Sequence, residues 1–251
     1  MEFKKIKTMK LIDFIDPPEH INKYLTHWTG RDKNDQDAFD ILTKIIDTKE
    51  LKFSRNEISF PNAHTTITQL MVCFTDTPIR QSVDHCKTYG YFGVSFNKHQ
   101  LTDYGASPVF YIVDNRRQHQ NFLQNIRFDN NEQSSLISWI SGMTQPFNTS
   151  PTNPNHYAEF YEREWRISRV LPFFWISIAE QSQGPHNEYP FKGNIQRRQI
   201  GTNKNNEEFF LPFEPAIIEN IIVPTDYEEQ TIELIKKNKL DIELLITTKK
   251  T

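Results

Sequence analysis

The most regular hydrophobic pattern in the chain predicts an amphipathic helix over Asp35–Asp47. Apolar residues in DQDAFDILTKIID recur at the i, i+3, i+4, i+7 spacing of one helical face, and acidic residues stand in the first turn. A second helix is predicted over Tyr227–Lys239, where glutamates precede lysines as the helix dipole favours. Asp226 is placed to cap it.

Short apolar runs bounded by turn residues predict the strands. They cover residues 21–29, 70–75, 91–96, 108–113, 162–170, 217–224 and 240–246. A short helix over Ser82–Lys87 follows the break at Asp76-Thr77-Pro78, and residues 97–104 have room for one or two helical turns. Strands mixed with short helices indicate the α+β class.

Three polar regions interrupt this pattern. Residues 115–140 favour a peripheral helix, and residues 144–156 form the clearest loop, rich in Pro, Asn, Ser and Thr. The loop could link two domains, but a strand follows it directly, so we interpret it as an insertion. Residues 181–206 are polar and are expected to be irregular. We therefore predict one domain over 1–251, with an insertion at about 114–156.

The composition indicates a globular protein without a general affinity for polyanions. Only 37% of the 251 residues are hydrophobic, but 19 Phe, 9 Tyr and 4 Trp supply large side chains for a core. The net charge of −3 argues against general attraction to nucleic acid or acidic membranes. No signal peptide or membrane-spanning run is present, so we expect a cytoplasmic protein that does not associate with membranes.

Several common catalytic motifs are missing from the sequence. It contains no phosphate loop, no dinucleotide fingerprint and no nucleophile elbow. The histidines are scattered, and the spacing of Cys73 and Cys86 matches no zinc or redox motif, so no metal site is expected. We expect Cys73 to be a small buried hydrophobic residue.

The motif HWTGR, His27 to Arg31, ends the first predicted strand. A histidine there can hydrogen-bond a ligand, Gly30 allows close approach of the backbone, and Arg31 can bind phosphate with two donors. The alternative is a histidine that is bonded to a neighbouring carbonyl group for structural reasons.

Tyr89 and Tyr91 lie in the segment YGYFG, where glycines leave room against the backbone. Their rings could stack on a flat base or nicotinamide. The alternative is ordinary core packing beside a bulge. Asp76 is expected to be a turn or cap residue.

The strand YEREWRI, 161–167, places Glu162, Glu164 and Arg166 on one face. One interpretation is a cross-strand salt-bridge ladder. The other is a catalytic glutamate that Arg166 holds in position.

Taken in order, the segments HWTGR, MVCFTDTPI, YGYFGVSF, ASPVFYIV and YEREWRI resemble the AbiGi family of abortive phage-resistance proteins. The resemblance covers about residues 20–113 and 157–170, and more loosely the chain after 215. The family label implies an antitoxin of a two-gene toxin–antitoxin system, which binds or neutralises a partner. Similar segments occur in chains that resemble the ADP-ribosyltransferase fold, which implies a split β-sheet flanked by helices.

One class of ADP-ribosyltransferases uses a histidine, a tyrosine and a glutamate in the chain order of His27, Tyr89 or Tyr91, and Glu164. The resemblance implies NAD as the substrate. Glu164 would bind the ribose 2′-hydroxyl and stabilise the positive charge of the transition state. His27, Thr29, Gly30 and Arg31 would hold the ribose and pyrophosphate, and a tyrosine would stack on the nicotinamide. Glu162 and Glu164 form an E-x-E pair, which is a feature of a different class.

From the sequence we predict a phage-defence protein that transfers ADP-ribose from NAD to RNA, DNA or protein. The alternative is a non-catalytic antitoxin or sensor that binds a partner toxin. A ribonuclease toxin has less support. A cognate toxin or antitoxin is expected as a partner in either case. An enzyme requires Glu164 in a cleft with His27 and a tyrosine, whereas a binding protein permits a Glu164 that is locked in an ion pair.

Overall fold

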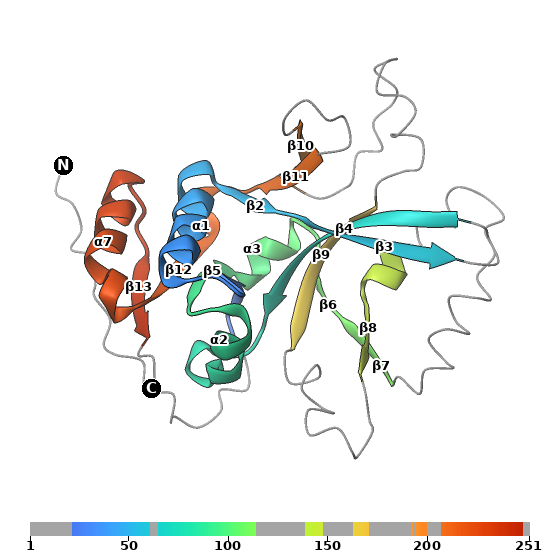
Figure 1. The fold of residues 1–251 in the computed structure, drawn as a ribbon, viewed down its shortest axis with the longest axis horizontal. Helices are drawn as coiled ribbons and strands as arrows, with labels where there is room; N and C mark the ends of the chain where they lie inside the picture. The colour runs from blue at the N-terminus through green and yellow to red at the C-terminus, as the bar shows by residue number, and fades with distance from the viewer. Residues whose placement is uncertain are drawn as a thin grey trace. The chain divides into compact units, whose positions relative to one another are not determined.

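The computed structural model describes residues 22–60, 65–113, 139–147, 163–170, 192, 194–199 and 207–247. The chain divides into two compact units. The first unit comprises Met1–Leu51, Phe74–Asp103 and Pro212–Thr251, and the second comprises Lys52–Cys73 and Tyr104–Leu211. Strands and helices are mixed along the chain, which confirms the α+β class (Figure 1).

The sheet of the first unit is mixed. Its strands are β1 (Tyr24–Thr29), β5 (Phe92–Asn97), β12 (Ile218–Pro224) and β13 (Glu243–Thr247), in the order β13-β12-β5-β1. β12 and β13 are parallel, whereas β5 is antiparallel to both β12 and β1. Phe92, Val94 and Phe96 are almost completely buried, so β5 lies in the core of this unit.

The helix α1 (Asp35–Thr48) confirms the strongest sequence prediction. The side chain of Asn34 caps it by accepting a hydrogen bond from the Asp37 N–H at 2.8 Å. Ala38, Leu42, Ile45 and Ile46 are buried, as the apolar stripe requires. The helix ends at Lys49, whose φ is +58°.

The helix α7 (Glu228–Lys237) is present, but Asp226 does not cap it, so that prediction is wrong. Asp226 lies inside the 3-10 turn η5 (Thr225–Tyr227), which makes Tyr227 the residue before the helix. The C-terminal ends of α1 and α7 are joined by an ion pair between Asp47 and Lys237, at 2.7 Å. Both helices belong to the first unit (Figure 1).

The first unit also contains four short helical elements. They are η2 (Ile79–Gln81), α2 (Val83–Tyr89), α3 (Lys98–Thr102) and η4 (Pro215–Ile217). α2 and α3 confirm the helical turns that we expected before and after the strand now described as β5.

The second unit contains a sheet of the order β3-β4-β9-β6. These strands are β3 (Ser54–Phe60), β4 (Thr65–Thr75), β9 (Glu164–Val170) and β6 (Ala106–Pro108). β3 and β4 are antiparallel in an unbroken register from Ser54↔Met71 to Phe60↔Thr65. β4 is the longest of these strands, and its last two residues, Phe74 and Thr75, belong to the first unit, where Thr75 pairs with Thr26 of β1.

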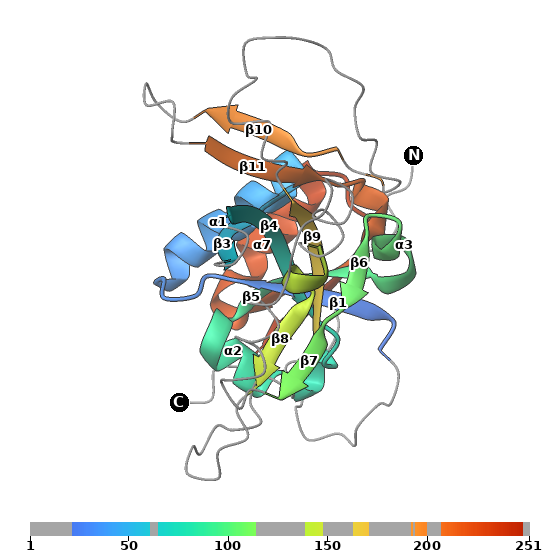
Figure 2. The same ribbon diagram turned by 90° about the vertical axis from the view of Figure 1, so that its right-hand side faces the viewer.

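Two smaller sheets complete the described strands. β7 (Phe110–Val113) and β8 (Thr144–Phe147) form a parallel pair (Figure 2). β2 (Glu50–Lys52), β11 (Glu207–Pro212) and β10 (Gln196–Gln199) form a three-stranded sheet. β10 and β11 are antiparallel.

The structure corrects three predictions that were made from the sequence. The expected strand at 108–113 is two strands, since β6 ends at Pro108 and β7 begins at Phe110. The loop at 144–156 begins with β8, and the irregular region 181–206 contains β10. Most of the expected helix 115–140 and of the insertion 114–156 lies outside the described residues.

Candidate functional site

An ion pair on β9 is the centre of the candidate site. Strand alternation puts Glu164, Arg166 and Ser168 on one face. Nε of Arg166 donates to one carboxylate oxygen of Glu164 and Nη2 donates to the other, each at 2.8 Å. The two side chains are only 9% and 11% exposed. Arg166 therefore binds both oxygens of a carboxylate that is largely shielded from water.

Backbone carbonyl groups bind the other end of the same guanidinium group. Nη1 of Arg166 donates to the carbonyl oxygen of Gly142 at 2.8 Å and to that of Thr144 at 3.2 Å. Burial opposes the positive charge, but hydrogen bonds and Coulombic attraction to Glu164 outweigh it and raise the pKa of Arg166.

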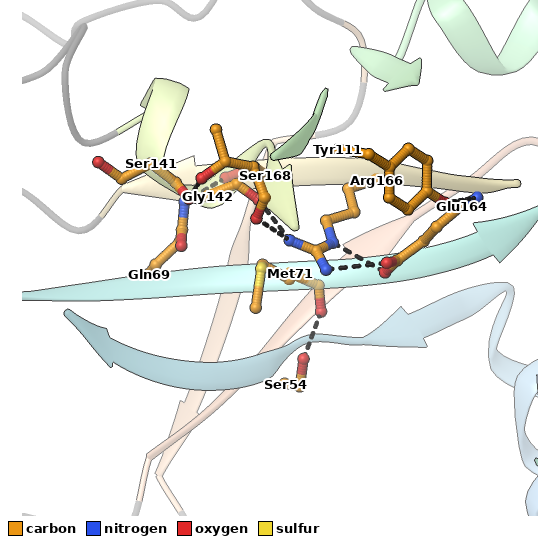
Figure 3. A network of polar contacts seen from close by, with 10 residues as sticks. Ser54, Gln69, Met71, Tyr111, Ser141, Gly142, Glu164, Arg166 and Ser168 are labelled. Carbon is orange, nitrogen blue, oxygen red and sulfur yellow. Dashed lines mark hydrogen bonds and ion pairs between the residues drawn. The ribbon is translucent and has the colours of Figure 1, made fainter. Parts of the chain in front are cut away.

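A buried amide extends this group of polar residues. Nε2 of Gln69 on β4 donates to the Ser168 hydroxyl at 2.8 Å, and Gly142 lies directly against the Gln69 side chain. We call Gln69, Gly142, Thr144, Glu164, Arg166 and Ser168 the β9 polar cluster. Figure 3 shows it between β4 and β9, with the Tyr111 hydroxyl accepting a hydrogen bond from the Glu164 N–H at 2.8 Å.

The opposite face of β9 carries a second buried arginine that the sequence analysis did not single out. Arg169 is only 2% exposed, and its Nη2 donates to the carbonyl oxygen of Tyr104 at 2.6 Å. Two buried arginines on opposite faces of one strand identify β9 as the polar centre of the second unit.

The two cysteines are unsuited to thiolate chemistry. Burial, together with the nearby Glu164 carboxylate, raises the pKa of the Cys73 thiol far above its ordinary value. Burial raises the pKa of Cys86 to about 12. Both thiols are therefore protonated at neutral pH, so neither supplies a nucleophile.

The HWTGR residues lie in the first unit, on β1 and just after it. His27 is within β1, opposite Val94 of β5, rather than at the strand end. Its ring contacts that of Phe74, with the ring centroids 5.8 Å apart. Trp28 points to the other face of β1 and packs in a buried cluster with Cys86, Ile222 and Leu245.

Two predicted site residues, Arg31 and Tyr89, contact each other directly. The Arg31 guanidinium carbon lies 5.5 Å from the centre of the Tyr89 ring, within the range of a cation–π contact. Tyr89 and Tyr91 are both half-buried and pack against the Trp28 cluster. Core packing, one of the two interpretations of the tyrosines, therefore accounts for much of their burial.

Gly30 and Gly90 bring two backbones together beside Arg31. Both have positive φ, +93° and +102°. A Cβ on Gly90 would lie 2.5 Å from the Thr29 carbonyl oxygen, and one on Gly30 would lie 2.4 Å from Cβ of Ala38. Thr29 itself is buried. Glycine at these positions is therefore required for packing, whether or not a ligand binds nearby.

Asp76 has a structural role that differs from the predicted turn or cap. Its carboxylate pairs with Lys98 at 2.9 Å, and its carbonyl oxygen accepts a hydrogen bond from Asn22 at 3.3 Å. These contacts tie the end of β4 to α3 and to the residues before β1.

The structure thus brings Thr29, Gly30, Arg31 and Tyr89 together in the first unit, with His27 and Tyr91 near them in the chain. Glu164 belongs to the second unit, so neither unit alone contains the predicted histidine, tyrosine and glutamate. In the described ranges, no group of three or more His, Cys, Asp or Glu side chains is arranged to hold a metal ion. Those ranges also contain no helix that is both long and apolar enough to cross a bilayer.

These features define an α+β protein with a buried ion-pair cluster on a central strand. Comparison with known families identifies the family to which the chain is related. A family model described as abortive phage resistance protein AbiGi, antitoxin, matches residues 40–224. The chain belongs to this family. No curated protein and no solved structure matches the chain.

Proposed function

We propose that this chain is the antitoxin of an abortive-infection system and that it neutralises a partner toxin by binding it. The match to the AbiGi antitoxin family over residues 40–224 supports the biological role. The observation that carries the binding mechanism is the Glu164–Arg166 pair, because both carboxylate oxygens already accept hydrogen bonds from one guanidinium.

This pairing favours a structural Glu164 for an electrostatic reason. A carboxylate that stabilises a developing positive charge must direct its own negative charge at the substrate. In Glu164 that charge is neutralised by an arginine fixed by two backbone carbonyl groups. Moving the arginine away would leave two buried charges uncompensated, which costs several kcal/mol.

The experiment is growth rescue in bacteria that produce the partner toxin. The toxin alone should arrest growth, and co-production of this chain should restore it. Glu164→Gln keeps the shape of the side chain, so a folded Glu164→Gln chain should still rescue growth. Glu57→Gln, at an exposed position on β3, is the matched control. Failure of the wild-type chain to rescue growth would reject the antitoxin role.

The second candidate is transfer of ADP-ribose from NAD to a nucleic-acid or protein acceptor. The specific observation in its favour is the Arg31–Tyr89 contact next to the closely packed Gly30 and Gly90. A cation beside an aromatic ring is suited to a ligand that has both phosphate and flat rings. In this proposal His27 and Tyr91 complete the NAD site, and Glu164 stabilises the transition state.

Labelled NAD separates the two candidates. Incubation with total RNA, DNA and protein should leave every fraction unlabelled if the chain acts only by binding. Label that appears with the wild type and disappears with Glu164→Gln would instead establish the transferase and reveal the acceptor class. Circular dichroism of the variant should first confirm that it is folded.

A further inference from the structure

We draw no further inference here: the strongest candidate, the buried cluster around Trp28 in the first unit, where the indole N–H has no hydrogen-bond partner among the described residues, carries no proposal because nothing in that part of the structure shows a cavity from which a ligand could accept the hydrogen bond.

Discussion

Arg166 is a charged side chain that is almost completely removed from water. Specific partners offset the free-energy cost of burying its charge. Glu164 neutralises the charge, and the carbonyl groups of Gly142 and Thr144 accept further hydrogen bonds. A buried ion pair contributes little net stability over an apolar pair of the same volume, but loss of one member is costly. The pair therefore acts to specify how β9 packs.

Arg166→Met should lower the free energy of unfolding by about 3–5 kcal/mol, because Glu164 would be left buried without its counter-charge. Urea unfolding at pH 7 measures the change. Glu164→Met/Arg166→Met removes both charges and should be more stable than the single variant. Equal or greater destabilisation in the double variant would show that the ion pair is not the relevant interaction.

Gly142→Ala should also destabilise the chain, for a steric reason. A Cβ at this position would fall 1.2 Å from Nε2 of Gln69, so the amide must move and break its bond to Ser168. The expected cost is about 1–3 kcal/mol, the range for a buried polar group that loses its partner. Thermal unfolding measures it, and Gly142→Ala in a Gln69→Ala background should recover part of the loss.

At the scale of elements, helices were more predictable than strands. The apolar stripe of α1 predicted its start at Asp35 and its end within one residue. β10 has four exposed polar residues, and Ser54–Glu57 of β3 are exposed as well, so neither segment carries the apolar signal of a strand. These strands form because neighbouring strands satisfy their backbone groups, and such pairing is not visible in local sequence.

Prediction of the candidate site from the sequence had the same limit: relations within one strand were visible, and contacts between distant segments were not. Alternation along YEREWRI correctly put Glu164 and Arg166 on one face, because two residues of one strand are related by a fixed period. Asp76 was assigned to a turn because Lys98, its partner, is far along the chain. Gln69 and Gly142 were missed for this reason too, since only the folded chain brings them to Ser168 and Arg166.

The junction of α1 and α7 should make stability depend on acid pH. Hydrogen bonds from Lys237 and Asn238 lower the pKa of Asp47 below its ordinary value near 3.8. A carboxylate with a lowered folded-state pKa stabilises the fold above its unfolded pKa, and this contribution is lost as the pH falls through the folded-state pKa. Asp47 is partly exposed, so the contribution at pH 7 should be under about 1 kcal/mol.

Asp47→Asn should therefore be slightly less stable than the wild type at pH 7, and the difference should disappear as the pH falls through the lowered folded-state pKa of Asp47. Denaturant unfolding of both proteins across this pH range measures it. Asp84→Asn is a suitable control, because that exposed carboxylate pairs only loosely with Lys87, at 3.4 Å. A difference that persists at low pH would mean that packing rather than charge accounts for the effect.

At the scale of the whole molecule, the first unit depends on residues from both ends of the chain. β5 is flanked by β1 from the first 51 residues and by β12 from the segment after Leu211. Ile221, Ile222 and Val223 of β12 are fully buried. The unit cannot be completed by any single continuous stretch of sequence.

A chain shortened to residues 1–211 should therefore fail to form the first unit. Without the segment after Leu211, one edge of β5 loses β12 and Phe39 of α1 loses its ring contact with Tyr227, so association of chains is expected. Size-exclusion chromatography should show aggregates in place of the species that the full chain forms. Slow hydrogen exchange at the β5 amides of a monodisperse shortened chain would contradict this dependence.

This arrangement has a consequence for how the protein is made. The second unit consists of residues 52–73 and 104–211, so the ribosome finishes it before β12 and β13 have been synthesised. The edge of β5 that will receive β12 therefore stays open on the nascent chain until the last part is translated. Translation that stops between Leu211 and β12 would yield chains with a complete second unit and an unfinished first one.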